Sequence, residues 1–197
     1  MLSPSRRITF VRHAMPVVDD GLAPAAWSLS AEGAVAASAL DLPTDAVAVA
    51  SPERKAVQTI ALARRVATED IATEARFREV DRVEAVHDDF RDARRAWVAG
   101  ALDARHTGWE HPHAAAHRFH EGLLAHPADH LIVGTHGMVL TAWMVAQGLI
   151  PPGEAATAFW EALPLPAVVE LATGGAVTVM GTPPDAALRG ARGQQIR

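Results

Sequence analysis

The chain contains no cysteine, and this absence excludes several kinds of chemistry. Disulfide bonds, thiolate zinc sites and cysteine nucleophiles are all ruled out, and nothing in the composition calls for an oxidising compartment. No apolar run approaches the roughly 20 residues that a membrane-spanning helix needs. Residues 1–7 carry two arginines but lead straight into a short strand pattern, which is unlike a secretory signal. We therefore expect a cytoplasmic protein with no membrane partner.

The chain also lacks a strong excess of charge of either sign. The formal net charge is −5, and acidic and basic residues are interspersed. Such a surface offers no broad positive area for nucleic acid or for an anionic membrane, so any anion site must be local. With 197 residues, 49% of them hydrophobic, the chain is long enough for one compact domain. We assign residues 1–181 to a single domain and 182–197, rich in proline, glycine and arginine, to a tail predicted to be disordered.

Apolar runs of strand character alternate with helical patterns along most of the chain. We expect strands over residues 8–11, 46–50 and 130–135, with a short edge strand over 71–80. The predicted helices cover residues 31–40, 88–99, 109–125 and 138–147. A further helix should begin with Ser51 as N-cap, Pro52 at its first position and Glu53 in its first turn, and should run to about Val66.

The two ends of this pattern complete the fold prediction. Ser30 is the expected N-cap of the first helix. Near the C-terminus, apolar runs over 167–171 and 176–180 flank Thr173-Gly174-Gly175, which favours a hairpin. Strands that alternate with helices and end in a hairpin predict an α/β fold, a three-layer α/β/α sandwich around a mostly parallel central sheet.

Two histidines follow predicted strands directly. Arg12-His13 ends the run 8–11, and His136-Gly137 comes after the run 130–135. In open α/β sheets ligands bind beyond the carboxyl ends of the strands, so both histidines are expected at one site. A histidine beside an arginine can act as a nucleophile toward phosphorus, because the guanidinium fork suits phosphate oxygens.

Five segments in chain order resemble the histidine phosphatase superfamily, also called phosphoglycerate mutase-like. Each is given with the family segment that it resembles: Val11-Arg12-His13-Ala14 with Arg-His-Gly, Leu29-Ser30-Ala31-Glu32-Gly33 with Leu-Thr-x-x-Gly, Ser51-Pro52-Glu53-Arg54-Lys55-Ala56-Val57-Gln58-Thr59 with Ser-Pro-x-x-Arg-Ala-x-Gln-Thr, Phe77-Arg78-Glu79 with Leu-Arg-Glu, and Thr135-His136-Gly137 with Ser-His-Gly.

The resemblance implies that His13 attacks the phosphoryl group and becomes phosphorylated, after which water hydrolyses the phosphohistidine. It implies a clamp on the phosphoryl oxygens made by Arg12, Lys55, His136 and the backbone N–H of Gly137. Glu79 matches the position of the family's acid and would protonate the leaving oxygen, a role that needs a raised pKa. The implied reaction needs no metal and no cofactor.

The chain departs from the family pattern at three places. Lys55 stands where the family has its second arginine, and Arg54 precedes it. Adjacent helical residues point about 100° apart, so one of the two should face the site, and the register of the segment favours Lys55. Ala14 replaces the usual glycine, a mild change if its φ is negative. Met15 and Pro16 replace the usual polar residues, which affects substrate contacts more than catalysis.

Several candidate residues have competing interpretations. Glu79 could be a surface carboxylate like the nearby Asp81 and Glu84. Glu110 could support the site or could be a first-turn helix carboxylate. His111, His113, His117 and His120 include pairs with helix-face spacing, as a metal site would need, but a polar helix face or a substrate-cap surface is the favoured interpretation. Arg91, Arg94 and Arg95 are expected in solvent, with contact to an anionic substrate tail as the alternative. The five tryptophans are expected in the core or at the rim of the site.

These observations predict a metal-independent phosphomonoesterase that acts on a small-molecule phosphate ester. The alternatives are a phosphoglycerate mutase-type phosphotransferase, a protein phosphohistidine phosphatase and a catalytically weak phospho-ligand-binding protein. Family mutases that depend on bisphosphoglycerate are longer than this chain. Specificity should depend on residues 15–27 and 80–126, and both a monomer and a homodimer stay open.

Overall fold

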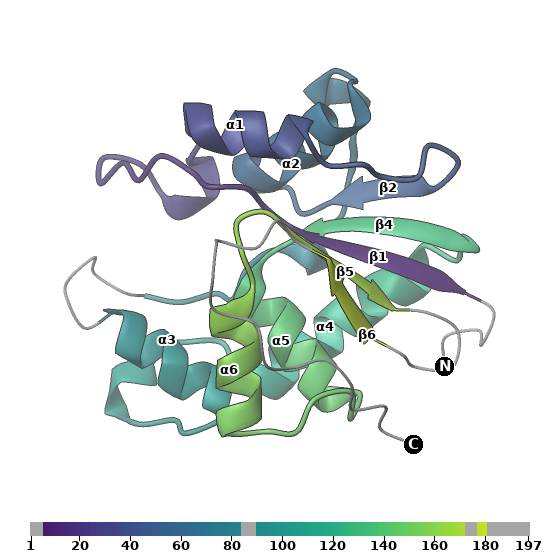
Figure 1. Cartoon of the computed structure of the whole chain (residues 1–197). Helices are drawn as coiled ribbons and strands as arrows, with labels where there is room; N and C mark the ends of the chain where they lie inside the picture. Colours follow the sequence, from purple (N-terminus) through teal and green to yellow (C-terminus); the bar gives the residue numbers. More distant parts are fainter. Residues whose placement is uncertain (1–5, 84–89, 172–176, 181–197) are drawn as a thin grey trace, which may run out of the picture.

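A computed structural model describes residues 6–83, 90–171 and 177–180 of the chain. Its strands form one mixed sheet in the order β3-β2-β4-β1-β5-β6 (Figure 1). The neighbours among β1 to β4 run parallel, whereas β5 is antiparallel to β1 and β6 to β5. The strands are β1 (Arg7–Arg12), β2 (Val47–Ala50), β3 (Ala72–Thr73), β4 (His130–Thr135), β5 (Ala167–Leu171) and β6 (Val177–Met180). The predicted α/β fold with a mostly parallel sheet is confirmed.

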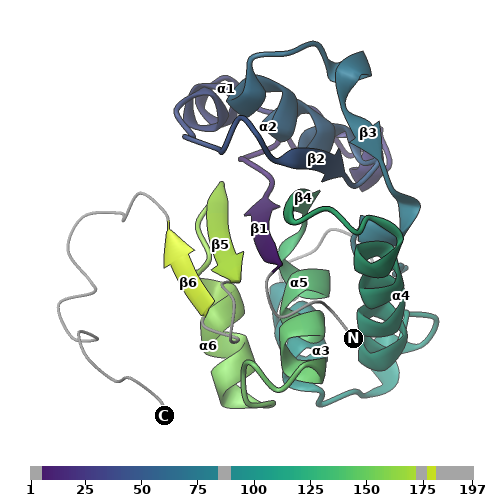
Figure 2. The ribbon, with the colours of Figure 1, turned by 90° about the vertical axis from the view of Figure 1, so that its right-hand side faces the viewer.

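Helices cover both faces of the sheet, which gives three layers (Figures 1 and 2). One face is covered by α1 (Ala31–Ser38) and α2 (Arg54–Arg64), and the other by α3 (Phe90–Ala99), α4 (Pro112–Ala125), α5 (Gly137–Ala146) and α6 (Glu154–Ala162). Because side chains alternate along a strand, Phe10 packs in the core on the α4–α5 side, and Val11 packs in the core on the α2 side. Burial on both faces explains the continuous apolar runs of β1 and β4.

The register of the central strands brings the chain segments of the site together. β1 pairs with β4 so that Arg12 lies opposite Thr135, and the backbone N–H of His13 donates to the Thr135 carbonyl oxygen at 3.0 Å. The N–H of Ser51, just after β2, donates to the Gly134 carbonyl oxygen at 2.8 Å. His13, Ser51 and His136 therefore leave the sheet at the same edge, as the sequence predicted for the two histidines.

The helix beginnings were predicted with mixed success. Ser30 is the N-cap of α1, and its hydroxyl accepts from the Gly33 N–H at 3.0 Å. The prediction that Ser51 caps the next helix was wrong, because α2 begins at Arg54 with Glu53 as its N-cap residue. The Ser51 hydroxyl accepts from the Glu53 N–H within a turn that precedes the helix. The helix ends at Arg64 instead of Val66, because Arg65 adopts a left-handed conformation with φ 54°.

Two further segments differ from the sequence prediction. Only Ala72–Thr73 of the predicted strand 71–80 pairs with β2. The 3-10 turn Ala75–Phe77 follows, because the Glu74 carboxylate accepts from the Arg76 N–H and Phe77 is buried. Helix α6 had not been predicted, and it follows the proline-rich break at a glycine with φ 78°.

Several predictions fall partly or wholly outside the residues that the structure describes. The β5–β6 hairpin is confirmed, although its turn, 172–176, lies outside those residues. So does the predicted tail 182–197, and the single-domain assignment of 1–181 stays a prediction. Within the described ranges, no helix combines the length and the apolar character needed to cross a membrane.

Candidate active site

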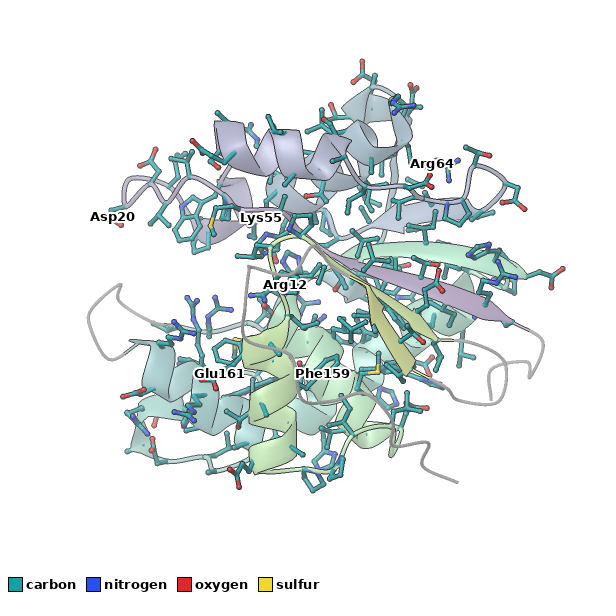
Figure 3. All side chains as sticks on the ribbon, in the orientation of Figure 1. Arg12, Asp20, Lys55, Arg64, Phe159 and Glu161 are labelled. Atoms are coloured by element: carbon teal, nitrogen blue, oxygen red, sulfur yellow. The ribbon has the colours of Figure 1, made fainter. Side chains whose placement is uncertain are left out.

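Side chains from three strand ends and from α2 converge beyond the carboxyl edge of the sheet. Arg12 and His13 follow β1, Ser51 follows β2 and His136 follows β4. Lys55 reaches the same edge from the first turns of α2, and Figure 3 shows Arg12 and Lys55 at the same end of the sheet. The arrangement joins residues from the central sheet and from the α1–α2 layer at one place.

His13 has one ring nitrogen fixed and the other available. Nδ1 donates to the Ala14 carbonyl oxygen at 2.8 Å, which leaves the lone pair on Nε2. The His136 ring lies 5.2 Å away, measured between ring centroids. Burial lowers the pKa of His13 well below 6.5, and His136 and Lys55 lower it further. The imidazole is therefore neutral at physiological pH, the form in which it can act as a nucleophile.

Arg12 is held from the opposite side by α6. Its Nη1 donates to the Leu163 carbonyl oxygen, just after that helix. Burial lowers the pKa of Arg12 to about 10, so the guanidinium keeps its charge at neutral pH. A Cβ on Gly137 would lie 3.1 Å from Arg12 Nε and 3.0 Å from Trp160 Nε1, tighter than most real Cβ contacts. Glycine at this position lets the guanidinium approach the beginning of α5.

Two buried nitrogen atoms of the site have no hydrogen-bond partner among the described residues. They are Nε of Arg12 and Nδ1 of His136. The other ring nitrogen of His136, Nε2, lies 2.8 Å from the Ser51 hydroxyl. Buried polar atoms are nearly always paired in proteins, so two such atoms at one sheet edge indicate a ligand that accepts hydrogen bonds. An oxyanion beside a guanidinium would satisfy both.

Glu79 lies at the beginning of α5. Its Oε1 accepts from the backbone N–H groups of Val80 and Val139, each at 3.0 Å. Burial raises the pKa of this carboxyl, but His136 and Arg82 outweigh burial, and the net shift is downward. The raised pKa that an acid role needs is therefore not present in the protein by itself, and it would require additional negative charge nearby.

Lys55 and Arg54 point in different directions. Lys55 is 5% exposed, and its ammonium donates to the Pro24 carbonyl oxygen at 2.8 Å and to Glu53. Arg54 is exposed and reaches the Ser28 hydroxyl at 3.4 Å. This orientation agrees with the register argument for Lys55, whose contact with phosphate stays a prediction. Ala14 does not have a positive φ, so it replaces the usual glycine without strain.

Glu53 is a member of the site that the sequence did not single out. Its Oε1 accepts from the Glu79 N–H at 2.7 Å and lies 3.4 Å from His136 Nε2. Burial raises the pKa of Glu53, but His136 and Lys55 overcome that effect and hold it at about 2. In the sequence it reads as a first-turn helix carboxylate, and only its buried neighbours reveal a second contact with the site.

Arg118, on α4, is the other residue that sequence reasoning missed. Its guanidinium pairs with the Glu110 carboxylate through two hydrogen bonds of 2.7 Å. It also donates to the carbonyl oxygens of Arg76, Arg78 and Glu79 at 2.7 to 3.0 Å. Glu110 accepts from the Asp81 N–H as well, at 3.2 Å. The predicted supporting role of Glu110 thus has a structural basis, because the pair holds the segment that carries Glu79.

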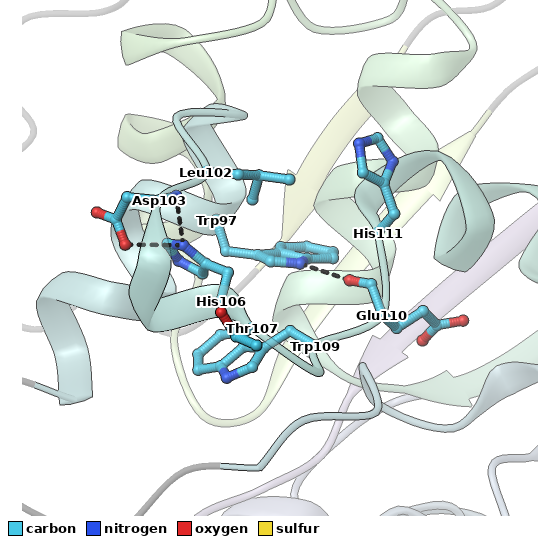
Figure 4. A pocket seen from close by; sticks show the side chains of 8 residues that line it. All are labelled: Trp97, Leu102, Asp103, His106, Thr107, Trp109, Glu110 and His111. Carbon is cyan, nitrogen blue, oxygen red and sulfur yellow. Dashed lines mark hydrogen bonds and ion pairs between the residues drawn. The ribbon is translucent and has the colours of Figure 1, made fainter.

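The remaining candidates lie in or beside the α3–α4 region. The rings of His111 and His113 stack at 5.4 Å, and no group of three described side chains is arranged to hold a metal ion. Arg91 and Arg94 lie near enough to Arg12 to lower its pKa. A pocket of about 300 Å³ lies in the predicted specificity segment. Figure 4 shows the side chains that line it, namely Trp97, Leu102, Asp103, His106, Thr107, Trp109, Glu110 and His111.

Comparison with solved structures supports the fold. The chain superimposes on a mycobacterial glucosyl-3-phosphoglycerate phosphatase with a TM-score of 0.57 and 20% identity, covering 84% of this chain and 89% of that one. It superimposes on the Thermus thermophilus protein TTHB049 with a TM-score of 0.61 and 23% identity, covering 87% of this chain and 96% of that one. For a protein described as mycobacterial hydrolase 1 the TM-score is 0.59 and the identity 21%, and the match covers 89% of this chain and 97% of that one. No curated protein sequence matches the chain.

A family comparison agrees with the geometry of the site. The model of the histidine phosphatase superfamily (branch 1) matches residues 27–161, which include Lys55, Glu79 and His136. Arg12 and His13 precede the matched range, and the sheet register places them beside His136. The protein therefore belongs to the histidine phosphatase superfamily.

Proposed function

We propose that the protein is a metal-independent phosphomonoesterase that acts through a phosphohistidine at His13. Membership of the superfamily supports a phosphoryl-transfer function. The observation that carries the proposal is the position of His13 Nε2. It is the free nitrogen of a neutral imidazole, at a sheet edge where buried Arg12 Nε and His136 Nδ1 have no partner among the described residues.

In the first step, His13 Nε2 attacks the phosphorus atom and the bond to the leaving oxygen breaks. Arg12, Lys55, His136 and the Gly137 N–H bind the equatorial oxygens, whose charge must be neutralised in a largely dissociative transition state. Glu79 donates a proton to the leaving oxygen. A phosphoryl dianion beside Glu79 would raise the pKa of this carboxyl and supply the protonated form.

In the second step, water attacks the phosphohistidine, and the ionised Glu79 accepts a proton from it. The nitrogen–phosphorus bond breaks, phosphate leaves and His13 returns to its neutral form. The same carboxylate thus acts first as acid and then as base. The proton that Glu79 gives to the leaving oxygen in the first step is replaced by the proton that it takes from water in the second.

We propose a small-molecule phosphate ester as substrate, the class of compound named in the description of one structural neighbour, a glucosyl-3-phosphoglycerate phosphatase. A catalytically weak phospho-ligand-binding protein is the second candidate, favoured by the engagement of Lys55 with Glu53 and Pro24. A mutase, a protein phosphohistidine phosphatase, the cytoplasmic location and the oligomeric state stay predictions.

The test is phosphate release from an aryl phosphate in the presence of EDTA. We expect turnover by the wild type, a phosphoryl adduct in intact mass spectra recorded without acid, and a loss of about 10³-fold or more in His13→Ala. The matched control is His130→Ala, because His130 lies at the amino end of β4, away from the site, and contacts Thr9 at 3.2 Å.

Three outcomes separate the candidates. Turnover that His13→Ala abolishes and His130→Ala retains supports the phosphohistidine mechanism. Turnover that survives in His13→Ala would contradict His13 as nucleophile. Binding of phosphate esters without phosphate release in any protein would favour the phospho-ligand-binding alternative.

A further inference from the structure

The site contains a carboxylate that the proposed mechanism does not use. The Glu53 side chain is 10% exposed and makes an ion pair with Lys55. Its other oxygen accepts from the Glu79 N–H at 2.7 Å. A buried carboxylate is unexpected where a phosphoryl dianion should bind, because like charges in a protein interior repel strongly.

Lys55 is largely occupied by these contacts. An ammonium group has three N–H donors, and two of them are directed at Glu53 and at the Pro24 carbonyl oxygen. The lysine is the residue that stands at the position of the family's second arginine. To bind a phosphoryl oxygen with more than one donor, it must release one of its present partners.

The charges of the central residues cancel. Arg12 and Lys55 carry one positive charge each, and Glu53 and Glu79 carry one negative charge each. Burial lowers the pKa of both His13 and His136, so neither histidine adds positive charge at neutral pH. A phosphoryl dianion entering this set meets four charged residues whose charges cancel, and further positive charge nearby comes from Arg82, Arg91 and Arg94.

We propose that Glu53 is a specificity-determining residue that competes with the phosphoryl group for Lys55. The inference rests on the proposed function and deepens it. In the resting protein Glu53 holds the ammonium, and a bound phosphoryl group draws it away. The affinity for bare phosphate is therefore low, product phosphate leaves readily, and a good substrate must gain binding energy from contacts beyond its phosphoryl group.

The test is a double-mutant cycle on phosphate affinity. Glu53→Gln removes the charge but keeps an oxygen that can accept from the Glu79 N–H. We expect this variant to bind inorganic phosphate about tenfold more tightly than the wild type in titration calorimetry, because Lys55 no longer has to leave a charged partner, and a hydrogen bond to a charged group is worth at least that much. In the Lys55→Met background the same substitution should give no gain.

A control and a second substitution make the cycle robust. Glu69→Gln removes an exposed carboxylate of the same type and should leave phosphate affinity unchanged. Glu53→Leu has a similar shape and no charge, and it should act in the same direction if Glu53→Gln does not fold. Thermal unfolding of each variant identifies those that fold.

The outcomes distinguish the inference from the proposed function. Equal or weaker phosphate binding by folded Glu53→Gln and Glu53→Leu overturns the inference, even where the wild type hydrolyses aryl phosphates. A gain that persists beside Lys55→Met also overturns it, because Glu53 would then act only as a repelling charge. Tighter phosphate binding without turnover in any protein supports the inference and contradicts the enzyme. If no protein binds phosphate, the inference fails, whereas the proposed function is decided by turnover.

Discussion

The groups proposed to bind phosphate also keep the nucleophile neutral. Lys55 and Arg12 both lower the pKa of His13, after burial and His136. A cationic clamp and a neutral imidazole therefore require the same local arrangement, since positive charge disfavours a second protonation of the ring. The backbone carbonyl of Ala14 acts in the opposite direction, but it fixes which nitrogen faces the site. Lys55 and Arg12 thus each have two effects from one position: they are placed to bind phosphate, and they lower the pKa of His13.

Gly137 provides a residue-scale prediction. Gly137→Ala places a methyl group at about 3 Å from Arg12 Nε and Trp160 Nε1. Alanine is the better helix former, so a purely conformational effect would stabilise α5. We expect the steric effect on Arg12 to dominate and turnover to fall by about tenfold or more, as misplacement of a positioning group does. Steady-state kinetics and phosphate titration measure the change.

The control for this prediction is Ala146→Gly, at the exposed far end of α5. It lowers helix stability by up to about 1 kcal/mol and should leave turnover unchanged. Unchanged turnover in Gly137→Ala would mean that Arg12 or Trp160 can move aside, and that close approach at this glycine is not needed.

The sequence predicted that Arg12, His13 and His136 lie together because they follow strands whose register is set by burial. The 100° separation of adjacent helical residues also selects Lys55 over Arg54. Glu53 escaped prediction because its role depends on Glu79 and His136, which come from two other segments, and a glutamate in a first helical turn is ordinary in isolation.

At the scale of elements, α4 positions the segment that carries Glu79. Arg118 binds three carbonyl oxygens of that segment and the carboxylate of Glu110. We expect Arg118→Leu to lower turnover by about tenfold with a smaller change in KM, because Glu79 would lose its position. The broken buried pair should also lower the free energy of unfolding by about 3 kcal/mol. A changed pH profile of turnover would report directly on Glu79.

Arg64 offers a matched control on the other helical layer. It also binds three carbonyl oxygens, those of Pro43, Thr44 and Ala46, ahead of β2 at the opposite edge of the sheet. Arg64→Leu should lower stability and leave both turnover and its pH profile unchanged. Equal effects of the two substitutions on turnover would show that Arg118 acts through general stability alone.

Elements buried on both faces were the ones that the sequence predicted well. β1 and β4 are continuous apolar runs because helices cover both sides of the sheet. Only two residues of the predicted strand 71–80 pair with β2, since the local Glu74–Arg76 contact turns the chain. Helix α6 was missed because a proline-rich break precedes it and its apolar pattern is short. Its end nevertheless supplies the carbonyl oxygen that holds Arg12.

At the scale of the whole molecule, the altered pKa values make stability depend on pH in two windows. His13 and His136 have a pKa below the usual 6.5 because of burial, and the pKa values of His120 and His130 are also lowered. Between the lowered pKa of a folded-state histidine and its usual pKa, the unfolded chain binds more protons than the folded one. A fall in pH through this range therefore favours unfolding. The pKa of Glu53, about 2 against 4.5, adds a second loss below pH 4.5.

We therefore expect the free energy of unfolding to fall as the pH decreases from 7.5 to 5.5. Each histidine with a lowered pKa contributes up to about 1.4 kcal/mol per pH unit below 6.5. Urea unfolding at several pH values measures this loss. The free energy of unfolding of His13→Asn should fall less steeply with decreasing pH than that of the wild type, by an amount equivalent to up to one bound proton. A free energy of unfolding that is constant across this range would contradict the burial of neutral histidines at the site.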